Sequence, residues 1–348
     1  MKTDIVKLEN RALMKLKSQP RYYRQRLLEE LGFIDEQGSA GVMLQVADLV
    51  RDLKRAGVYI GPGQGYATCS LLCFCLGITG IDPLEYELPF AMFEDRFRAH
   101  EPMAITTSPG GLEVAQNILP CFTLTDECLE EKLTLEIVEM TTLLVQKDLY
   151  EAHSEPLQAI WLDNPTLSMF EQGDTARIFG FLSVGIQEKL REFNPRNHRE
   201  LALVYALYPT EKLDNILRIK NERTVRDWGS VAARRVMRES FGELVYVEQW
   251  IQLKQLEKTL PESVRAWIPD NSDGLQLRGQ ALAATRISIE QAYFKSRAQG
   301  RYDDSERQDR VRRIAEAWNN AQVADKARRK EAIKQACARV RERRKHND

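Results

Sequence analysis

Apolar residues recur at helical spacing in two segments near the start of the chain. The first, over residues 22–31, is followed by Gly32, and the second, over residues 40–56, is followed by Gly57. Glycine is common directly after a helix because it readily adopts the left-handed backbone of a C-terminal cap. The pattern therefore predicts two helices that end at these glycines. It also predicts short strands at residues 58–60 and 133–138, helices at 67–76 and 240–256, and short helices between 163 and 207.

A glycine-rich segment, Gly61-Pro62-Gly63-Gln64-Gly65, stands between the predicted strand at 58–60 and the predicted helix at 67–76. A strand, a glycine loop and a helix N-terminus together form a good phosphate site, because unpaired N–H groups and the helix dipole point at one spot. The segment lacks the Lys-Ser/Thr ending of a P-loop, and its glycine spacing is not that of the dinucleotide-binding fingerprint. A phosphate site and a tight turn that only reverses the chain are therefore both open.

The composition is typical of a soluble globular protein, with 348 residues, of which 43% are hydrophobic and 29% are charged. A wholly disordered chain and a collagen-like chain are excluded. The dense apolar run at residues 71–76 is far shorter than the roughly 20 residues that cross a bilayer. No apolar segment of a signal peptide follows the first residues. We therefore expect a cytoplasmic protein without a membrane partner.

The cysteines do not indicate a disulfide scaffold, because there are only six in a chain of this length. Three of them, Cys69, Cys73 and Cys75, stand close together in an apolar run, without the second group of cysteines or histidines that a zinc site needs. We interpret them as buried helix residues. The four histidines are scattered and form no metal-binding motif.

Charge is distributed unevenly along the chain. From Lys295 to Asp348 there are 17 basic and 9 acidic residues, a net charge of +8, whereas the rest of the chain carries −9. Helically spaced apolar residues and strong helix formers predict a long helix there. Clustered positive charge attracts DNA phosphates, although the solvated face of a packed helix would have the same composition. The expected DNA-binding residues are Arg328, Arg329, Lys330, Arg339, Arg341, Arg343 and Arg344.

Several blocks of the sequence form an ordered series. In chain order they are Arg26-Leu27 with Glu30-Leu31, Val46-Ala47-Asp48, Ile60 to Gly65 with Ser70-Leu71, Ile78-Thr79 with Asp82-Pro83-Leu84, Leu162-Asp163-Asn164-Pro165 with Gln172-Gly173-Asp174-Thr175, and Ser240-Phe241-Gly242 with Glu248-Gln249. The series resembles the palm entrance and fingers of bacterial C-family replicative polymerases, the DNA polymerase III alpha subunit. It covers residues 22–256, about two thirds of the chain.

The resemblance implies an α+β fold: a polymerase-beta-like nucleotidyltransferase palm with a small mixed sheet, helical fingers and a long basic C-terminal helical extension. It implies a palm-like region with the glycine loop at residues 1–150, a helical fingers-like region at 151–270 and the basic extension at 271–348. Gln64 and Tyr66 stand where the family has arginine and serine. The implied nucleotide- or phosphate-binding residues are Gly61, Gly63, Gln64, Gly65, Tyr66, Ser70 and Arg98.

The resemblance also implies where catalysis would take place and why it would be lost. The family's P-D-F-D-V-D motif supplies aspartates that hold two Mg²⁺ ions, and here Met103 and Ile105 stand in the aspartate places. A thioether and an alkyl group do not bind Mg²⁺, which takes oxygen ligands. The third aspartate would fall at Glu136, a weak candidate that is also typical of an exposed strand carboxylate. We therefore expect no catalytic residues, no metal and no other cofactor, with Mg²⁺ only if a residual site exists.

These observations predict a polymerase III alpha-like protein that has lost polymerase catalysis. It would act as a scaffold that binds DNA through the basic C-terminal helix, or binds an active replication or repair protein. One alternative is a protein-interaction decoy of a mobile element or phage-related system. Another is an enzyme that binds a nucleotide at the glycine loop. If the chain is active as a polymerase, the expected activity is DNA-directed DNA synthesis.

Overall fold

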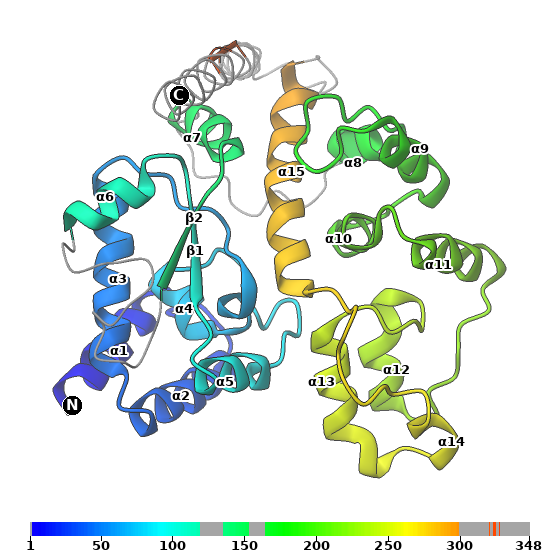
Figure 1. Ribbon diagram of the computed structural model, residues 1–348, viewed down its shortest axis with the longest axis horizontal. Coiled ribbons are helices and arrows are strands. Elements are labelled where there is room, and N and C mark those ends of the chain that lie inside the picture. The colour runs from blue at the N-terminus through cyan, green and yellow to red at the C-terminus, as the bar shows by residue number, and fades with distance from the viewer. Residues whose placement is uncertain are drawn as a thin grey trace, which may run out of the picture.

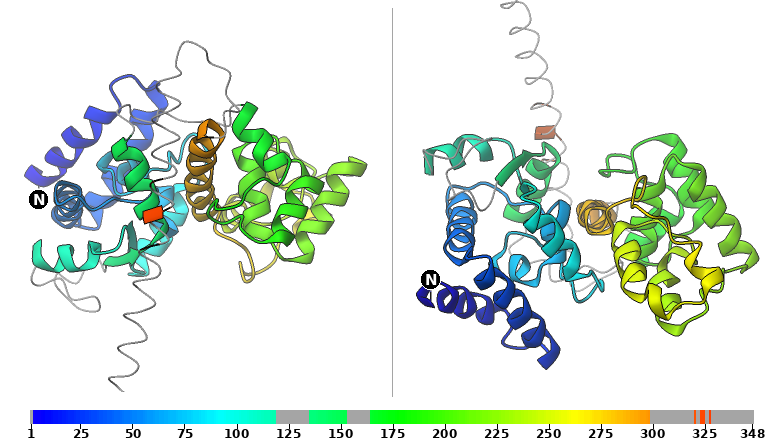
Figure 2. Two further views of the ribbon diagram at one scale, coloured as in Figure 1. Left: turned by 90° about the horizontal axis from the view of Figure 1, so that it is seen from above. Right: turned by 60° about the horizontal axis from the view of Figure 1, so that its bottom comes forward.

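The computed structural model describes residues 2–118, 135–152 and 164–298, together with positions 320, 323, 324 and 327. Figure 1 shows two groups of elements, one from the N-terminal part of the chain and one from its middle, with a long helix between them. That helix, α15 (Arg278–Ala298), lies between the two groups in the further views as well (Figure 2). All seven predicted DNA-binding residues, which belong to the basic segment after α15, lie outside the described residues.

The N-terminal group is built mainly of helices around one small sheet. Its elements are α1 (Lys2–Lys15), α2 (Arg21–Glu36), α3 (Ala40–Arg55), the 3₁₀ helix η1 (Gly65–Cys69), α4 (Leu71–Leu76), α5 (Phe90–Arg98), β1 (Met103–Thr107), α6 (Gly111–Ile118), β2 (Leu135–Glu139) and α7 (Thr142–Ala152). The middle group contains α8 (Asn164–Glu171), α9 (Val184–Phe193), α10 (His198–Leu207), α11 (Glu211–Glu222), α12 (Val231–Met237), η2 (Arg238–Ser240), α13 (Val247–Leu256), η3 (Glu257–Thr259) and α14 (Glu262–Arg265).

Helix α3 confirms the helix predicted at residues 40–56, whereas α2 continues past its predicted end at Gly32. The reason is that the apolar stripe of α2 continues with Phe33 and Ile34, which are both buried. The ring of Phe33 meets the rings of Phe90 and Phe97 of α5 edge to face, with centroids 5.6 and 5.7 Å apart. Packing against α5 therefore extends α2 across the glycine.

The helix predicted at residues 67–76 is divided into two. The chain forms η1 first, becomes extended at Ser70 (φ −105°, ψ 124°) and then forms α4. Gly77, in the left-handed conformation, ends α4. The strand predicted at 58–60 is reduced to a single antiparallel bridge between Ile60 and Thr107. The helix predicted at 240–256 begins only at Val247, whereas α8, α9 and α10 confirm the short helices predicted between 163 and 207.

The sheet of the described residues has two parallel strands, β1 and β2, so the coarse α+β prediction is confirmed. Strand β2 also confirms the strand predicted at residues 133–138. The two named strands are parallel, and the antiparallel partner of the predicted mixed sheet is limited to the Ile60–Thr107 bridge. Across the described residues, no helix has both the length and the apolar character to cross a membrane.

Apolar side chains form one large core and one smaller cluster. The large core includes Leu27 of α2, Ile105 of β1 and Leu282 of α15, all fully buried, so it continues from the N-terminal group into α15. The smaller cluster lies within the middle group and includes Trp228 and Met237. The predicted boundaries at residues 150 and 270 stay predictions, and α15 packs against both groups.

Candidate functional site

The glycine segment is held close to β1 and to the turn after α4. The N–H of Gly61 donates to the carbonyl oxygen of Thr106 at 2.8 Å, and the N–H of Gly80 donates to the carbonyl oxygen of Pro62 at 2.8 Å. A Cβ at Gly61 would collide with the side chain of Thr106, and one at Gly63 (φ +116°) would collide with that of Thr79. Close packing alone therefore requires glycine at these two positions.

The N-terminus of α4, the helix start after the glycine segment, where a phosphate site and a simple tight turn were both open, is occupied by a carboxylate of the protein itself. Glu30 of α2 is fully buried and accepts hydrogen bonds from the N–H groups of Leu71 and Leu72, both at 2.9 Å. It also accepts from Oγ of Ser70 at 2.8 Å and from Nε of Arg26 at 2.7 Å. The first turn of α4 thus already has an anion at its positive end.

The surroundings of Glu30 act on its pKa in opposite directions. Burial raises the pKa of the Glu30 carboxyl and is the largest effect, while the Arg26 guanidinium and the hydrogen bonds from Leu72, Leu71 and Ser70 lower it. Since four donors converge on this carboxylate, its structural role is to fix the connection between the glycine segment and α4. Ser70, a predicted phosphate ligand, contributes to this connection and accepts from the N–H of Cys73 at 3.1 Å.

The other predicted nucleotide-binding residues do not converge on one point. The hydroxyl of Tyr66, which is buried, donates to the carbonyl oxygen of Glu101 at 2.8 Å. Arg98 lies at the end of α5, with its guanidinium 4.8 Å from the ring centroid of Phe33 and 3.8 Å from Glu94. Gln64 and Gly65 are half-buried on the glycine segment itself.

A positively charged pocket of about 170 Å³ lies beside the start of the glycine segment, and the sequence analysis missed it. Its lining includes Lys15 of α1, Lys54 of α3 and Arg286 of α15, together with Gly61, and also Glu290, whose carboxylate pairs with Arg286 at 3.1 Å. Burial lowers the pKa of both lysines, and for Lys15 the neighbouring Lys54 and Arg286 lower it further. These cations come from three helices far apart in the sequence, so no local motif indicates them.

The same cations have a structural role at the C-terminal end of α4. Nζ of Lys15 donates to the carbonyl oxygen of Phe74 at 2.7 Å, and Nζ of Lys54 donates to that of Gly77 at 3.2 Å. Arg286 donates to the carbonyl oxygen of Gly80. Cations near helix C-terminal carbonyls are stabilising because they complement the negative end of the helix. The positive side chains of this pocket therefore stabilise the C-terminal end of α4 and the turn that follows it.

The register of the sheet separates Glu136 from the two positions expected to carry metal aspartates. Ala104 pairs with Glu136, whereas Met103 pairs with Leu135 and Ile105 pairs with Ile137. Paired residues share a face and alternate residues lie on opposite faces. Glu136 therefore shares a face with Ala104, and Met103 and Ile105 lie on the other face.

The face that carries Met103 and Ile105 is part of the core. Both side chains are fully buried, and Sδ of Met103 lies 4.0 Å from Sγ of Cys73 in α4. The opposite face carries Ala104 and Thr106, and the side chain of Thr106 faces Gly61. Strand β2 contributes Glu136 and Val138 to this second face, so among the residues of β1 and β2 the exposed Glu136 supplies its carboxylate.

No group of three or more histidine, cysteine, aspartate or glutamate side chains is arranged to hold a metal ion within residues 2–118, 135–152 and 164–298. The other carboxylate of β2, Glu139 at its C-terminal end, accepts a hydrogen bond from the N–H of Leu112 at 3.0 Å, close to the start of α6.

Cys69, Cys73 and Cys75 are buried with free thiols, in agreement with their prediction as buried residues. Burial raises the pKa of the Cys73 thiol to about 12, so it stays protonated and inert.

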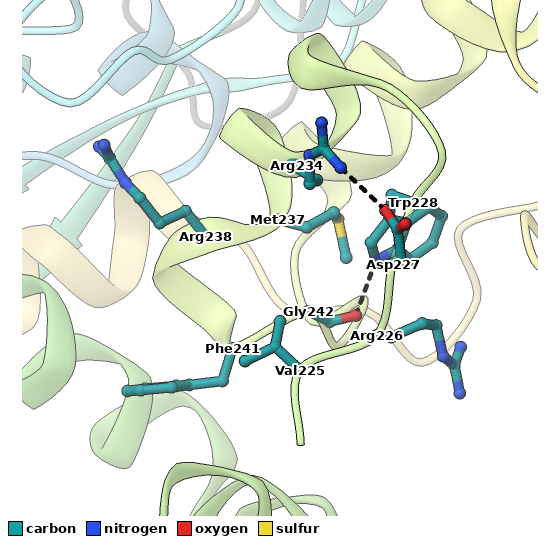
Figure 3. Close-up of a pocket in the computed structure, with 9 residues that line it drawn as sticks. All are labelled: Val225, Arg226, Asp227, Trp228, Arg234, Met237, Arg238, Phe241 and Gly242. Atoms are coloured by element: carbon teal, nitrogen blue, oxygen red, sulfur yellow. Dashed lines mark hydrogen bonds and ion pairs between the residues drawn. The ribbon is translucent and has the colours of Figure 1, made fainter. Parts of the chain in front are cut away.

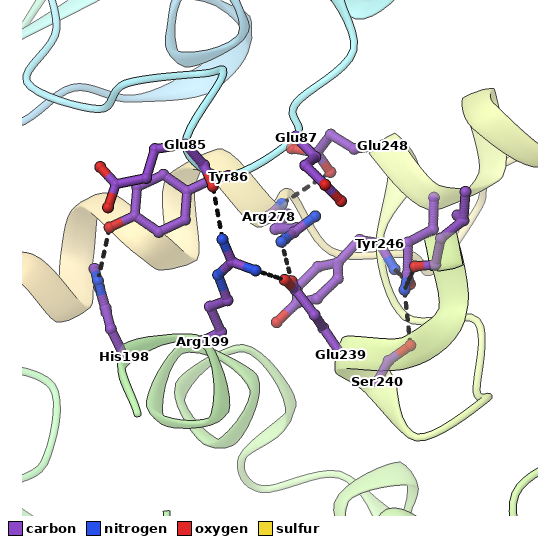
Figure 4. A network of polar contacts seen from close by, with 12 residues as sticks. Glu85, Tyr86, Glu87, His198, Arg199, Glu239, Ser240, Tyr246, Glu248 and Arg278 are labelled. Atoms are coloured by element: carbon purple, nitrogen blue, oxygen red, sulfur yellow. Dashed lines mark hydrogen bonds and ion pairs between the residues drawn. The ribbon is translucent and has the colours of Figure 1, made fainter. Parts of the chain in front are cut away.

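A network of partly buried polar contacts joins the two groups of elements (Figure 4). Glu239 forms ion pairs with Arg199 of α10 and with Arg278 at the start of α15. Arg199 also donates to the carbonyl oxygen of Glu85, in the turn before α5. Burial lowers the pKa of Arg278 to about 10, and the positive charge of Arg199 acts in the same direction. The charged groups thus hold the turn, α10 and α15 in one arrangement.

The N-terminus of α15 is capped in the same way as that of α4. Glu248, which is buried, accepts hydrogen bonds from the N–H groups of Arg278 and Gly279, both at 2.9 Å. Gln249 accepts from the N–H groups of Val245 and Tyr246, both at 3.1 Å. Glu248-Gln249 belongs to one of the sequence blocks noted above, and the structure shows that both side chains fix helix starts.

Comparison with known proteins gives two family matches. Residues 4–103 match the bacterial DNA polymerase III alpha NTPase domain, and residues 134–263 match the finger domain of the bacterial DNA polymerase III alpha subunit.

Individual relatives match a shorter part of the chain. DNA polymerase III subunit alpha of Helicobacter pylori is 39% identical over 95 residues, which are 27% of this chain and 8% of that protein. The corresponding protein of Streptococcus pyogenes is 41% identical over 80 residues, 23% of this chain and 8% of its own length. An error-prone DNA polymerase of Cutibacterium acnes is 40% identical over 79 residues, 23% of this chain and 7% of that protein. The matched segments thus span less than a tenth of each relative's length.

Proposed function

Because this chain is a homologue of the bacterial DNA polymerase III alpha subunit in its NTPase and finger regions, we propose that it keeps their supporting scaffold without nucleotidyl transfer. In this proposal the sheet and the helices α1 to α7 correspond to a nucleotidyltransferase palm, and α8 to α14 correspond to fingers. The scaffold binds DNA, or a replication or repair protein that is itself active.

The observation that carries the proposal is the side-chain content of β1. Its five residues are Met, Ala, Ile, Thr and Thr, so neither face of the strand carries a carboxylate. Phosphoryl transfer by two metals requires oxygen ligands that hold both ions, and Mg²⁺ is held mainly by carboxylates. If the family motif is placed one residue earlier or later on β1, the motif positions lie on the other face of the strand, which carries no carboxylate either. Glu136 alone does not fit a pair of Mg²⁺ ions.

Binding to nucleic acid is supported by the charge of the C-terminal segment. Residues 295–348 carry a net charge of +8, and neutralisation of DNA phosphates by clustered cations needs no specific sequence. Nucleotide binding at the glycine segment has less support, because the donors of Gly61, Ser70 and Tyr66 and the first turn of α4 bond within the protein.

Primer extension on a primed template, with Mg²⁺ or Mn²⁺ and all four deoxynucleotides, tests the loss of catalysis. We expect no incorporation by the wild-type chain or by Glu136→Ala. Template-directed incorporation that Glu136→Ala abolishes would refute the proposal and identify Glu136 as a metal ligand.

A separate measurement tests DNA binding. The affinity for duplex DNA, followed by fluorescence anisotropy, should fall steeply as salt rises. Replacement of Arg339, Arg341, Arg343 and Arg344 by glutamine should weaken DNA binding. It should also make the slope of log affinity against log salt concentration shallower, by several released ions. Glutamine at Arg51 and Arg55, on the exposed side of α3, provides a control with fewer lost charges on another surface. Unchanged binding by the first variant would exclude the C-terminal segment as the DNA site.

A further inference from the structure

A second pocket, of about 300 Å³, opens on the middle group, in the region of the finger-domain match (Figure 3). It lies between residues 225–228, helix α12 and the turn at Phe241 and Gly242. Trp228 and Met237, each 1% exposed, form its floor, and Val225, which is 54% exposed, stands at its mouth. An apolar side chain that is half exposed beside a concave apolar surface is typical of a binding site.

The floor of this pocket favours an apolar occupant. Nε1 of Trp228 donates to the carbonyl oxygen of Gly242 at 2.9 Å, so both of these polar groups are already satisfied. The side chains of Met237, Phe241 and Val225 add apolar surface around them. A nucleobase placed here would lose water from its polar edge without gaining a partner from these groups, and an unpaired buried polar group costs about 1–3 kcal/mol. A hydrocarbon or aromatic side chain has no such penalty.

The rim carries positive charge. Arg226, Arg234 and Arg238 leave it in different directions, and Asp227 is the acidic side chain among the lining residues (Figure 3). Arg234 pairs with Asp227 at 3.2 Å, but this ion pair is exposed, and exposed pairs contribute about 1 kcal/mol or less. Arg226 stacks over the ring of Trp267 at 5.0 Å, and its Nη2 lies 3.9 Å from Oε1 of Glu243 in a partly exposed ion pair. A ligand carboxylate can therefore exchange with Asp227 at little cost.

We propose that this pocket binds an acidic peptide segment of a partner protein. One large apolar side chain of the segment fills the space above Trp228 and Met237, and neighbouring carboxylates bind the guanidinium groups of the rim. Arginine suits this role because its planar group can form two parallel hydrogen bonds with a carboxylate. An apolar anchor in a pocket surrounded by charged contacts is the usual arrangement of an interaction hot spot. The inference names a partner class for the proposed scaffold and rests on that proposal.

Selection of random peptides displayed on phage, with the full chain as target, tests the proposal. Peptides that also bind the variant Val225→Asp are removed from the pool. This substitution places a negative charge at the mouth of the pocket without changing a buried residue. We expect the remaining peptides to share an apolar residue flanked by aspartate or glutamate. A synthetic fluorescein-labelled peptide of that sequence should bind Val225→Asp and Arg238→Glu at least about tenfold more weakly than wild type, a change of about 1.4 kcal/mol.

Two variants on nearby surfaces serve as matched controls. Val231→Asp changes a valine that is 76% exposed and lies outside the pocket lining, and Arg218→Glu reverses an exposed charge on α11. Both should bind the peptide as wild type does. Failure to enrich acidic apolar peptides, or equal losses in Val225→Asp and Val231→Asp, would overturn the proposal.

Competition distinguishes a nucleic-acid site from a peptide site. An oligothymidylate that displaces the labelled peptide from wild type, and itself binds Val225→Asp more weakly, would show that the pocket takes single-stranded DNA and would refute the peptide proposal. Peptide binding and primer extension are measured independently. An active polymerase with a functional pocket would refute only the scaffold function, and an inactive chain without peptide binding would refute only the pocket.

Discussion

His198 lies at the junction of the two groups of elements, and its burial predicts a specific pH dependence of stability. Its side chain is in α10, with Nδ1 3.0 Å from the hydroxyl of Tyr86 and Nε2 2.7 Å from Oγ1 of Thr285 and 3.2 Å from the carbonyl oxygen of Leu282. The residue is only 5% exposed. Burial lowers the pKa of His198 to about 3, and the positive charge of Arg286 acts in the same direction.

The sign of the effect follows from the two pKa values. The unfolded chain binds a proton at the imidazole near pH 6.5, whereas the folded protein keeps the imidazole neutral down to about pH 3. The contribution of neutral His198 to stability is therefore fully present above pH 6.5 and is lost as the pH falls towards 3. Each pH unit below 6.5 lowers the free energy of unfolding by about 1.4 kcal/mol, which gives about 2 kcal/mol between pH 7 and pH 5.

Urea unfolding of wild type and of His198→Gln at both pH values isolates this contribution, because the other titrating groups are common to the two proteins. Wild type should lose about 2 kcal/mol more than His198→Gln on going from pH 7 to pH 5. His100→Gln, at an exposed histidine, should follow wild type. Parallel losses in wild type and His198→Gln would refute the reasoning. So would an NMR titration in which His198 of the folded protein gains its proton near pH 6.5.

Three further substitutions test the packing of the N-terminal group by urea unfolding. Glu30→Gln removes the charge that faces Arg26 and the first turn of α4, so the free energy of unfolding should fall by about 3 kcal/mol. The control Glu29→Gln, on the exposed side of α2, should stay within about 0.5 kcal/mol of wild type. Equal effects of the two substitutions would contradict the role of the buried pair. Gly61→Ala should destabilise by about 1–3 kcal/mol, because the added methyl group collides with β1, and an unchanged midpoint would mean that the glycine segment adjusts freely. Gly32→Ala should stabilise by about 0.5–1 kcal/mol, since Gly32 lies inside α2 with open space around it; a loss of stability would show that the glycine has another role.

The sequence predicts an element well where its signal is local. The apolar stripe of α3 and the stop after it lie within one segment, and the helix was predicted within a residue of its observed end. Gly32 does not end α2, because Phe33 and Ile34 beyond it continue the apolar face and are buried in the core. Phe33 has the rings of α5 beside it, and α5 lies more than fifty residues further along the chain. Tertiary contacts of this kind are not visible in a local pattern.

The candidate site was harder to predict because its decisive features are pairings between distant segments. The family resemblance placed Met103, Ile105 and Glu136 at the positions of three metal aspartates. The strand at Met103–Thr107 and the register that separates Glu136 from Met103 and Ile105 are visible only in the structure. The glycine segment followed by a helix predicted a phosphate or a simple tight turn, whereas the N-terminus of α4 holds an anion that belongs to the protein. The anion is Glu30, which is forty residues earlier in the chain.

The distribution of buried charge bears on the proposed scaffold role. A buried carboxylate is expensive to desolvate, and apolar residues of similar volume often replace a buried ion pair without loss of stability. Stability alone therefore does not explain why Glu30 and Glu248 are buried and why Glu239 is partly buried. Each of them fixes a position: Glu30 sets the start of α4, Glu248 sets the start of α15, and Glu239 joins α10 to α15 through Arg199 and Arg278.

Such directional contacts matter where the relative placement of surfaces matters, because hydrogen bonds to a charged group tolerate little displacement. Polymerisation would need that placement at the sheet, where β1 offers methyl, methylene and hydroxyl groups but no carboxylate. The pocket at Trp228 lies on the surface of the middle group, within the finger-domain match. In the proposed scaffold function, these contacts would hold the surface around that pocket in a fixed position relative to α15.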